Sequence, residues 1–376
     1  MILVEKIDTT NKKQVDRFIK VQFDLYQNCP QWVPPFYSDI KVMLNHDKHP
    51  FYEHSDAEFF IAVKDGIDAG RIAALENKPF NAYHGTKDAE FYFFDSINDQ
   101  EVANALFKTV FDWAKARGLN HIVGPKGMSP FDGYGIQVEG FEHRQMMTMM
   151  NYNYDYYQKL VEALGFEKEV DFVSCYIPAP NFHLDPKIKL IADKVVERGT
   201  FKVIRFNTKP PLVKYADRIC EAYNKTFVNN WEYYPLTMKE VRFAVNQVID
   251  FANPKLIKII EHQGEVVGFL FGFQDVSKAL QRAKGKLNLF SIIDILLEVG
   301  RTNWVSFNGM GVLPEFHGRG GNALLYSEME NTIHEFHFEH ADLTQVAETT
   351  KQMRKDLENV GGKAYKNHRV FQKLLD

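Results

Sequence analysis

Residues 305–329 read VSFNGMGVLPEFHGRGGNALLYSEM, and this stretch decides the fold that we expect. A short apolar run from Val305 is typical of a strand, and the spacing of apolar residues after Asn322 is typical of a helix. A glycine-rich turn joins them, so several backbone N–H groups are left without partners at the positive end of the helix, where a phosphate can bind. The sequence therefore predicts a pyrophosphate-binding loop. Its residues are His317, Gly318, Arg319, Gly320, Gly321, Asn322 and Ala323.

The spacing excludes two commoner nucleotide-binding loops. A Walker loop ends in Gly-Lys-Ser/Thr, and a dinucleotide fingerprint places G-x-G-x-x-G after the first strand of a βαβ unit. Neither pattern is present. An ordinary tight turn that caps a helix is the alternative explanation, because short glycine motifs also arise by chance.

The stretch resembles motif A of the GNAT superfamily, the acyl-CoA-dependent N-acyltransferases. In that motif a strand ending in Val-x-Pro-Glu-Tyr/Phe leads into Gln/Arg-x-x-Gly-x-Gly/Ala. The matching residues are Val312, Pro314, Glu315, Phe316, Gly318 and Gly320. His317 stands where the family has Gln or Arg, and Asn322 where it has Gly or Ala. The resemblance implies that the loop binds acetyl-CoA or a longer acyl-CoA as a co-substrate.

The two halves of the chain show the same order of expected elements. Residues 57–75 and 255–273 each read as two strands around a tight turn, at Asp65-Gly66 and at Gln263-Gly264. A strand–helix–strand unit follows in each half, and then a helix that ends in glycine before a strand. This alternation predicts an α/β class. It is also the GNAT element order, so the resemblance implies two tandem GNAT-like domains with a mixed sheet.

A proline-rich break at residues 178–186 (PAPNFHLDP) marks the expected junction. It gives domains 1–180 and 181–376. The first domain lacks the glycine loop and has Asp95, Asp99 and Glu101 near the matching helix start, where carboxylates would repel a pyrophosphate. We therefore expect one acyl-CoA site, in the second domain.

The resemblance also implies roles for residues near the loop. In the superfamily the strand before motif A splays from its parallel neighbour, and one backbone N–H faces the thioester carbonyl; here the candidates are Gly311 and Val312. The amine must lose a proton before it attacks, and the candidate bases are Glu348 and a group near Asn308. The alternative for Glu348 is a carboxylate at the start of the next helix.

Three functions stay open at this level. The first is N-acyl transfer from acyl-CoA to a small-molecule or lipid amine, with a sphingoid amine as one compatible acceptor. The second is FemABX-like aminoacyl transfer from tRNA, against which the intact glycine loop argues. The third is a non-catalytic CoA- or ligand-binding protein, which is favoured by His317, by Asn322 and by Leu357, which stands where many members have a tyrosine that protonates the thiolate.

Two further segments bear on the acceptor. The long polar and aromatic segment 124–157 is the expected roof of an acceptor site between the halves, and packing between the halves is the alternative. Its candidate contacts are Asp132, Tyr134, Glu139, Tyr152 and Tyr154. Residues 287–299 (LNLFSIIDILLEV) form a helix that is apolar nearly all round, which favours core burial over a peripheral membrane contact or the wall of an apolar pocket.

Composition narrows the remaining classes. The 376 residues are 45% hydrophobic and 25% charged, with a net charge of −4 and no basic stripe, so we expect no nucleic-acid partner. Three cysteines without paired spacing predict neither disulfides nor a zinc site, and indicate the cytoplasm. No run is long enough for a transmembrane helix. The histidines at 334, 337 and 340 lack a completing ligand, so we assign no metal.

Overall fold

The computed structural model describes residues 1–147, 150–179, 182–231, 233–249 and 252–375. The chain forms two compact units, each built from segments that lie far apart in the sequence. Unit 1 consists of Met1–Phe172, Ser277–Leu297 and Lys366–Asp376, and unit 2 of Val173–Val276 and Glu298–Tyr365. The expected boundary between residues 180 and 181 lies outside the described residues and stays a prediction.

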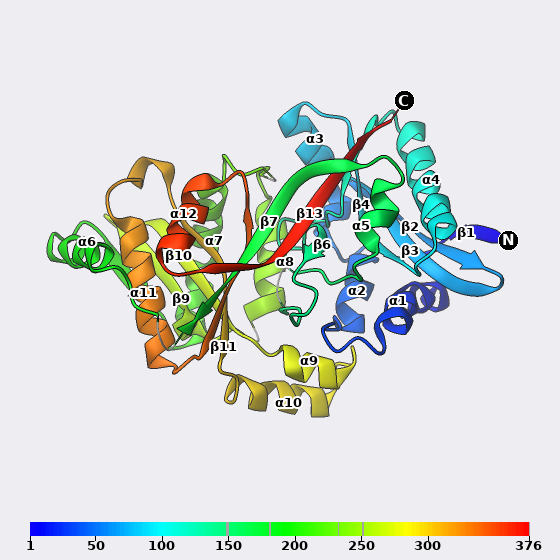
Figure 1. Cartoon of the computed structure of the whole chain (residues 1–376). Coiled ribbons are helices and arrows are strands. Elements are labelled where there is room, and N and C mark those ends of the chain that lie inside the picture. The colour runs from blue at the N-terminus through cyan, green and yellow to red at the C-terminus, as the bar shows by residue number, and fades with distance from the viewer. Residues whose placement is uncertain (148–149, 180–181, 232, 250–251, 376) are drawn as a thin grey trace. The chain divides into compact units, whose positions relative to one another are not determined.

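Unit 1 contains a mixed sheet with helices packed on it (Figure 1). Its strand order is β1-β2-β3-β4-β5-β13, in which β4 and β5 are parallel and the other neighbouring pairs are antiparallel. The strands are β1 Ile2–Lys6, β2 Asp56–Lys64, β3 Ile67–Glu76, β4 Asp88–Ser96, β5 His121–Gly124, β6 Ile136–Glu139 and the later part of β13 Lys363–Leu374. The helices are α1 Lys12–Tyr26, α2 Tyr37–Met43, α3 Lys78–His84, α4 Gln100–Ala116, α5 Tyr157–Glu162 and α9 Ser277–Ala283, together with most of α10 Leu289–Val299.

Unit 2 repeats this plan. Its strand order is β7-β12-β11-β10-β9-β8, with β11 and β12 parallel. The strands are the later part of β7 Glu167–Pro178, then β8 Lys202–Arg205, β9 Ile257–His262, β10 Glu265–Gln274, β11 Trp304–Val312 and β12 His340–Ala347. The helices are α6 Pro186–Glu197, α7 Lys209–Thr226, α8 Met238–Ile249, α11 Gly321–Glu335 and α12 Lys351–Asn359. The mixed α/β class expected from the sequence is confirmed.

The two tight turns expected from the repeat are present. Asp65 and Gly66 have φ values of 51° and 83°, and Gln263 and Gly264 have φ values of 52° and 87°. Two successive positive φ angles are those of the turn that best joins twisted antiparallel strands. These turns set the registers of β2 with β3 and of β9 with β10.

The acidic residues near the α4 start have structural roles. The Asp99 side chain accepts hydrogen bonds from the N–H groups of Glu101 and Val102, which caps α4 and contributes about 1 kcal/mol. Asp95 lies in β4 and forms a buried ion pair with Arg71 at 2.7 Å. The Asp99 side chain therefore occupies the N-cap position of α4, at which α11 has only a glycine.

The expectation that residues 287–299 are buried in a core is wrong. They comprise the two residues before α10 and α10 itself, and most of the apolar side chains of α10 are exposed. Among the described residues, no helix is both long enough and apolar enough to cross a membrane.

Candidate functional site

The parallel strands β11 and β12 separate toward their carboxyl ends. Their register begins with Trp304 opposite His340 and ends with Phe307 opposite Leu343, whereas β11 continues to Val312 and β12 to Ala347. Beyond Phe307 the β11 backbone still pairs with β10, on its other side. The splay that the resemblance implies is therefore present in unit 2.

A β-bulge lies at the start of the splay. Leu270 of β10 pairs with Met310, but Gly272 pairs with Phe307, so β11 has one extra residue in this interval. Gly309 lies within it and has a φ of 134°, which a side chain would not readily adopt. A bulge bends the strand and redirects its backbone groups.

The direction of the Val312 amide follows from its neighbour. The Leu313 N–H donates to the Val267 carbonyl of β10 at 2.8 Å. Because successive backbone N–H groups along a strand point to opposite edges, the Val312 N–H points away from β10, toward the edge from which β12 has separated. Of the two expected thioester contacts, Gly311 and Val312, the geometry therefore favours Val312.

The loop after β11 is held to the strand end by His317. Its Nε2–H donates to the Val312 carbonyl at 2.8 Å, which fixes the protonated nitrogen because a carbonyl only accepts. Gly318 has a φ of 74° with open space around it. Arg319 is exposed, and its guanidinium lies 5.1 Å from the centre of the Phe316 ring. A cation therefore lies beside the loop.

The first turn of α11 presents backbone donors. Gly320 is the N-cap in a left-handed conformation, and no side chain caps the helix. Leu324 makes the helical bond to the Gly320 carbonyl at 3.1 Å, so the N–H groups of Gly321, Asn322 and Ala323 precede it. Together with the helix dipole, these three donors suit an anion such as a pyrophosphate.

Helix α6 restricts Gly320. A Cβ atom built there would lie 2.5 Å from Val195 Cγ2 and 3.2 Å from Ile191 Cγ2, both in α6. Gly320 is therefore required by its φ of 88° and by this contact. A substitution at Gly320 would disturb the α6 packing as well as any ligand, so Asn322 is a cleaner position for a test.

A polar cluster that the sequence did not reveal lies beside the splay. Asp342 is fully buried in β12, and it accepts hydrogen bonds from the hydroxyls of Tyr365, Thr344 and Ser306, the last at 3.3 Å. The Ser306 hydroxyl has one proton, which it can donate either to Asp342 or to the nearer Asn308 Oδ1, 2.8 Å away. An aspartate inside an apolar strand pattern was the available signal, but its partners depend on strand register.

The two residues proposed as bases differ in position. Asn308 lies at the bulge and receives the Ser306 bond, but a neutral amide does not take up a proton at neutral pH. Glu348 is half-buried in the turn after β12, beyond the end of the strand. Its role as a base stays a prediction.

The first pair of expected acceptor contacts takes part in the packing of unit 1. Asp132 Oδ2 accepts the Ser129 N–H at 2.9 Å, and burial raises the pKa of Asp132 to about 6. The Tyr134 ring stacks on Phe172 with a centroid distance of 5.0 Å. Segment 124–157 also contains the short strand β6.

The second pair of expected acceptor contacts gathers around Tyr26 of α1. Tyr154 stacks on Tyr26 at 5.1 Å and donates its hydroxyl to the Leu25 carbonyl at 2.9 Å, while Tyr152 meets the Tyr26 ring edge at 6.2 Å. These contacts explain why the segment is rich in tyrosine. A role of either pair in acceptor binding stays a prediction.

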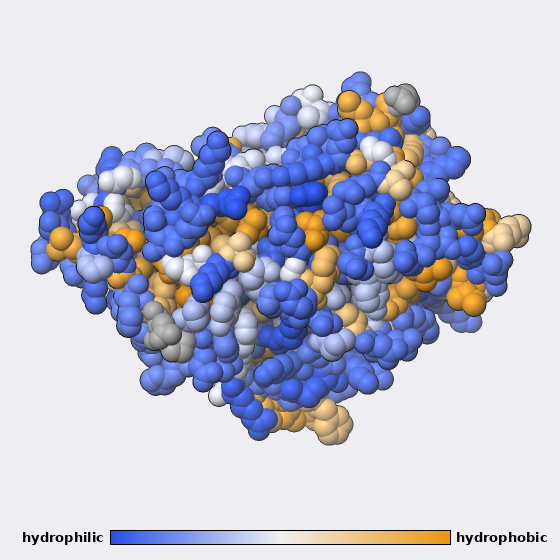
Figure 2. Space-filling view, in the orientation of Figure 1, coloured by the Kyte–Doolittle hydropathy of each residue, from blue (hydrophilic) through white to orange (hydrophobic). Residues whose placement is uncertain are grey.

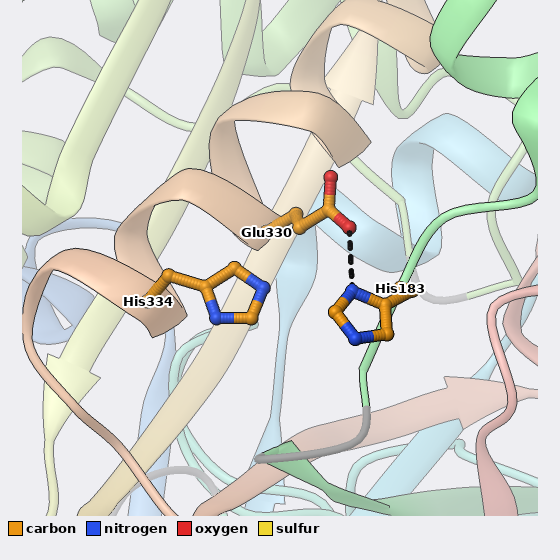
Figure 3. A group of neighbouring side chains, drawn as sticks. All are labelled: His183, Glu330 and His334. Carbon is orange, nitrogen blue, oxygen red and sulfur yellow. Dashed lines mark ion pairs between the residues drawn. The ribbon is translucent and has the colours of Figure 1, made fainter.

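Three side chains at the other end of α11 have the chemistry of metal ligands (Figure 3). The ligand atoms of His183, Glu330 and His334 lie within 4.8 Å of one another, and His183 Nδ1 is 3.7 Å from Glu330 Oε1. The same carboxylate oxygen accepts the Leu184 N–H at 2.9 Å. Two imidazoles and a carboxylate could hold a zinc ion. The sequence pattern groups His334 with His337 and His340 and does not indicate His183, because His183 is remote along the chain.

Two curated proteins are similar to this chain along nearly its whole length. No family model matches the chain. It is 28% identical over 371 residues to the bacterial ceramide synthase of Caulobacter vibrioides, covering 96% of this chain and 95% of that protein. It is 25% identical over 374 residues to protein YghO of Escherichia coli, covering 97% and 94%.

Among solved structures, a tandem GNAT protein from the clavulanic acid biosynthesis pathway has a TM-score of 0.57 at 10% identity. The alignment covers all of this chain and 98% of that chain. The fold of this chain thus has a solved counterpart along the whole length. The chain therefore has the GNAT fold in its tandem arrangement.

Proposed function

We propose that the chain is an N-acyltransferase that takes a long-chain acyl group from acyl-CoA and attaches it to a lipid amine of the sphingoid type. One observation chiefly supports acyl transfer. A single strand and the loop after it hold both the Val312 N–H, which points away from β10, and the first turn of α11, which no side chain caps. The name of the Caulobacter relative, similar along the whole chain, supports the lipid amine.

Each part of this site has a task in the reaction. The donors of Gly321, Asn322 and Ala323 bind the pyrophosphate of CoA, and Arg319 adds positive charge beside them. The Val312 N–H donates to the thioester oxygen as negative charge develops on it, a contribution of several kcal/mol in acyl transfer.

The proton and the leaving group must also be accounted for. The amine nitrogen attacks the thioester carbon, so that a C–N bond forms and the C–S bond breaks. Asp342, through its hydroxyl partners, accepts the proton that the nitrogen loses, and CoA leaves as a thiolate that is then protonated. Because a thiol has a pKa near 8.5, this leaving group needs little assistance, which suits a chain with Leu357 in place of the usual tyrosine.

Calorimetric titration with acetyl-CoA and palmitoyl-CoA tests the binding site. In the Asn322→Asp variant a carboxylate replaces a neutral side chain next to the expected pyrophosphate, so we expect affinity to fall at least tenfold. The same carboxylate suits a helix N-terminus, so the melting temperature should not fall. The matched control is Asn331→Asp, at an exposed position toward the other end of the same helix, which should bind as the wild type does.

The outcomes separate the hypotheses. Wild-type affinity in Asn322→Asp would remove the loop as the CoA site. If neither thioester binds the wild type, the acyl-CoA proposal is overturned in favour of aminoacyl transfer or a non-catalytic role. Tighter binding of palmitoyl-CoA, with an amide product detected by mass spectrometry when sphinganine is added, is the result that we expect.

A further inference from the structure

Helix α10 exposes its apolar face to solvent, whereas an ordinary surface helix exposes its polar face. Six of its apolar side chains are between 38% and 83% exposed, with Phe290 the most exposed of them. They are Leu289, Phe290, Ile292, Ile293, Leu296 and Leu297. Figure 2 shows hydrophobic atoms at its lower edge, where Figure 1 places α10. Soluble proteins seldom expose so many neighbouring large apolar side chains.

The exposed face is uniformly apolar. At about 100° per residue, the six side chains fall within an arc of about 160° that contains no polar residue. The opposite side of the helix carries Ser291, Ile295 and Glu298, all less than 9% exposed. The helix therefore has two distinct faces, and the one facing outward is the more hydrophobic.

This orientation is fixed by contacts within unit 1. The Gln281 side chain of α9 donates to the carbonyls of Pro30 at 2.8 Å and Trp32 at 2.9 Å. The Arg282 side chain of α9 forms an ion pair with Asp294 of α10 at 2.8 Å. These contacts hold the α9–α10 hairpin against the segment that follows α1. The apolar face of α10 is therefore held in a fixed orientation toward solvent.

The charge of the hairpin indicates what covers this face. The α9–α10 hairpin, residues 277–299, contains four basic side chains, Lys278, Arg282, Lys284 and Lys286, and two acidic side chains, Asp294 and the buried Glu298. All four basic residues are exposed. The chain as a whole has a net charge of −4, so the hairpin is a basic region in an acidic protein.

We propose that α10 is an interfacial docking helix that binds the surface of a membrane containing anionic lipids. Apolar side chains of an amphipathic helix enter the boundary of the acyl chains, and basic side chains beside it are attracted to anionic headgroups. With 11 residues, α10 is about 16 Å long, which suits a helix lying in the surface plane.

A second copy of the chain is the less suitable occupant. A symmetric dimer through α10 would place the same surface of both copies in contact, and so would bring two basic hairpins together. A lipid surface instead offers the opposite charge. The inference goes beyond acyl transfer, although a docked enzyme would meet long-chain amines where they reside.

Co-flotation of the full-length protein with lipid vesicles tests the inference. We expect wild type to float with vesicles of phosphatidylcholine and phosphatidylglycerol, and less with phosphatidylcholine alone. The double variant Phe290→Glu/Leu296→Glu should lower the partition coefficient at least tenfold, because it removes two inserted side chains and adds two negative charges. Since both side chains are exposed, circular dichroism and melting temperature should not change.

Matched controls separate a specific surface from general acidity. Ile67→Glu/Val213→Glu introduces the same charges at apolar side chains that are 72% and 52% exposed elsewhere, and should float as wild type does. Lys284→Gln/Lys286→Gln should lose binding mainly to the anionic vesicles. The assay needs no acyl-CoA, so its result is independent of the acyl-transfer proposal.

Three results would overturn the docking proposal. One is failure of the wild type to float with anionic vesicles. Another is an equal loss of flotation in both glutamate double variants. The third is a wild-type dimer, measured by light scattering, that Phe290→Glu/Leu296→Glu converts to a monomer, which would identify the face as a contact between copies.

Discussion

At the scale of single residues, Asp342 is the group that the structure adds to the chemistry. Its carboxylate is removed from solvent and surrounded by the hydroxyls of Ser306, Thr344 and Tyr365. A buried carboxylate is costly unless hydrogen bonds satisfy it, so a cluster of this kind beside the splayed strands calls for a function. Proton acceptance from the amine is the function that the acyl-transfer proposal requires.

We expect Asp342→Asn to lower kcat by about a hundredfold or more while KM for acyl-CoA changes little, because general-base catalysis typically contributes a factor of this size. Retained acyl-CoA binding in the calorimeter would show that the variant is folded. Thr344→Val removes one hydrogen bond to the carboxylate and should have a smaller effect on kcat.

Glu348→Gln is the comparison that decides between the two carboxylates. It should leave kcat within a few-fold of wild type if Asp342 is the proton acceptor. A large loss of kcat in Glu348→Gln, together with normal turnover in Asp342→Asn, would instead assign the base to Glu348, one of the two candidates that the resemblance implies.

At the scale of elements, the bulge in β11 connects the sheet to the proposed chemistry. Gly309 has a φ of 134°, and a Cβ atom there would lie 3.1 Å from the Phe271 ring. A side chain at this point should straighten or shift the bulge and so move the Val312 amide that follows it.

We therefore expect Gly309→Ala to lower kcat at least tenfold, measured as CoA release with a thiol reagent, with a loss of stability of about 1–3 kcal/mol. The matched control is Gly264→Ala, which has a positive φ of 87° but no neighbour within 4 Å. It should cost similar stability without the loss of kcat. Equal kcat values in the two variants would dissociate the bulge from catalysis.

The elements also show what sequence patterns can and cannot predict. The turns at Asp65-Gly66 and Gln263-Gly264 and the glycine loop were predictable, because each depends on a few adjacent residues with special backbone angles. The partners of Asp342 were not, since they depend on the parallel register that places Ser306 opposite it. The orientation of α10 was also missed, because an apolar sequence does not indicate whether a partner covers the helix.

At the scale of the whole molecule, the chain exchanges segments between its two units. The α9–α10 hairpin lies between two strands of unit 2 in the sequence, yet residues 277–297 belong to unit 1. The end of the chain does the same: β13 begins in unit 2, and from Lys366 onward it belongs to unit 1. Local periodicity identifies a strand but not the sheet that it joins, so the repeat in the sequence could not reveal these exchanges.

This exchange predicts which unit will be destabilised by a cavity introduced near the C-terminus. Phe371 pairs with Gly124 of β5 and is buried in the unit 1 core, whereas Phe338 is buried in the unit 2 core. Each Phe→Ala change should cost about 3–5 kcal/mol. In hydrogen exchange measured by mass spectrometry, Phe371→Ala should speed exchange in β4 and β5 and leave β9 and β10 protected, and Phe338→Ala should do the reverse. Local opening occurs in the unit whose core has been weakened, so the region of faster exchange identifies that unit. If Phe371→Ala speeds exchange in β9 and β10 and leaves β4 and β5 unchanged, the last strand stabilises unit 2 instead.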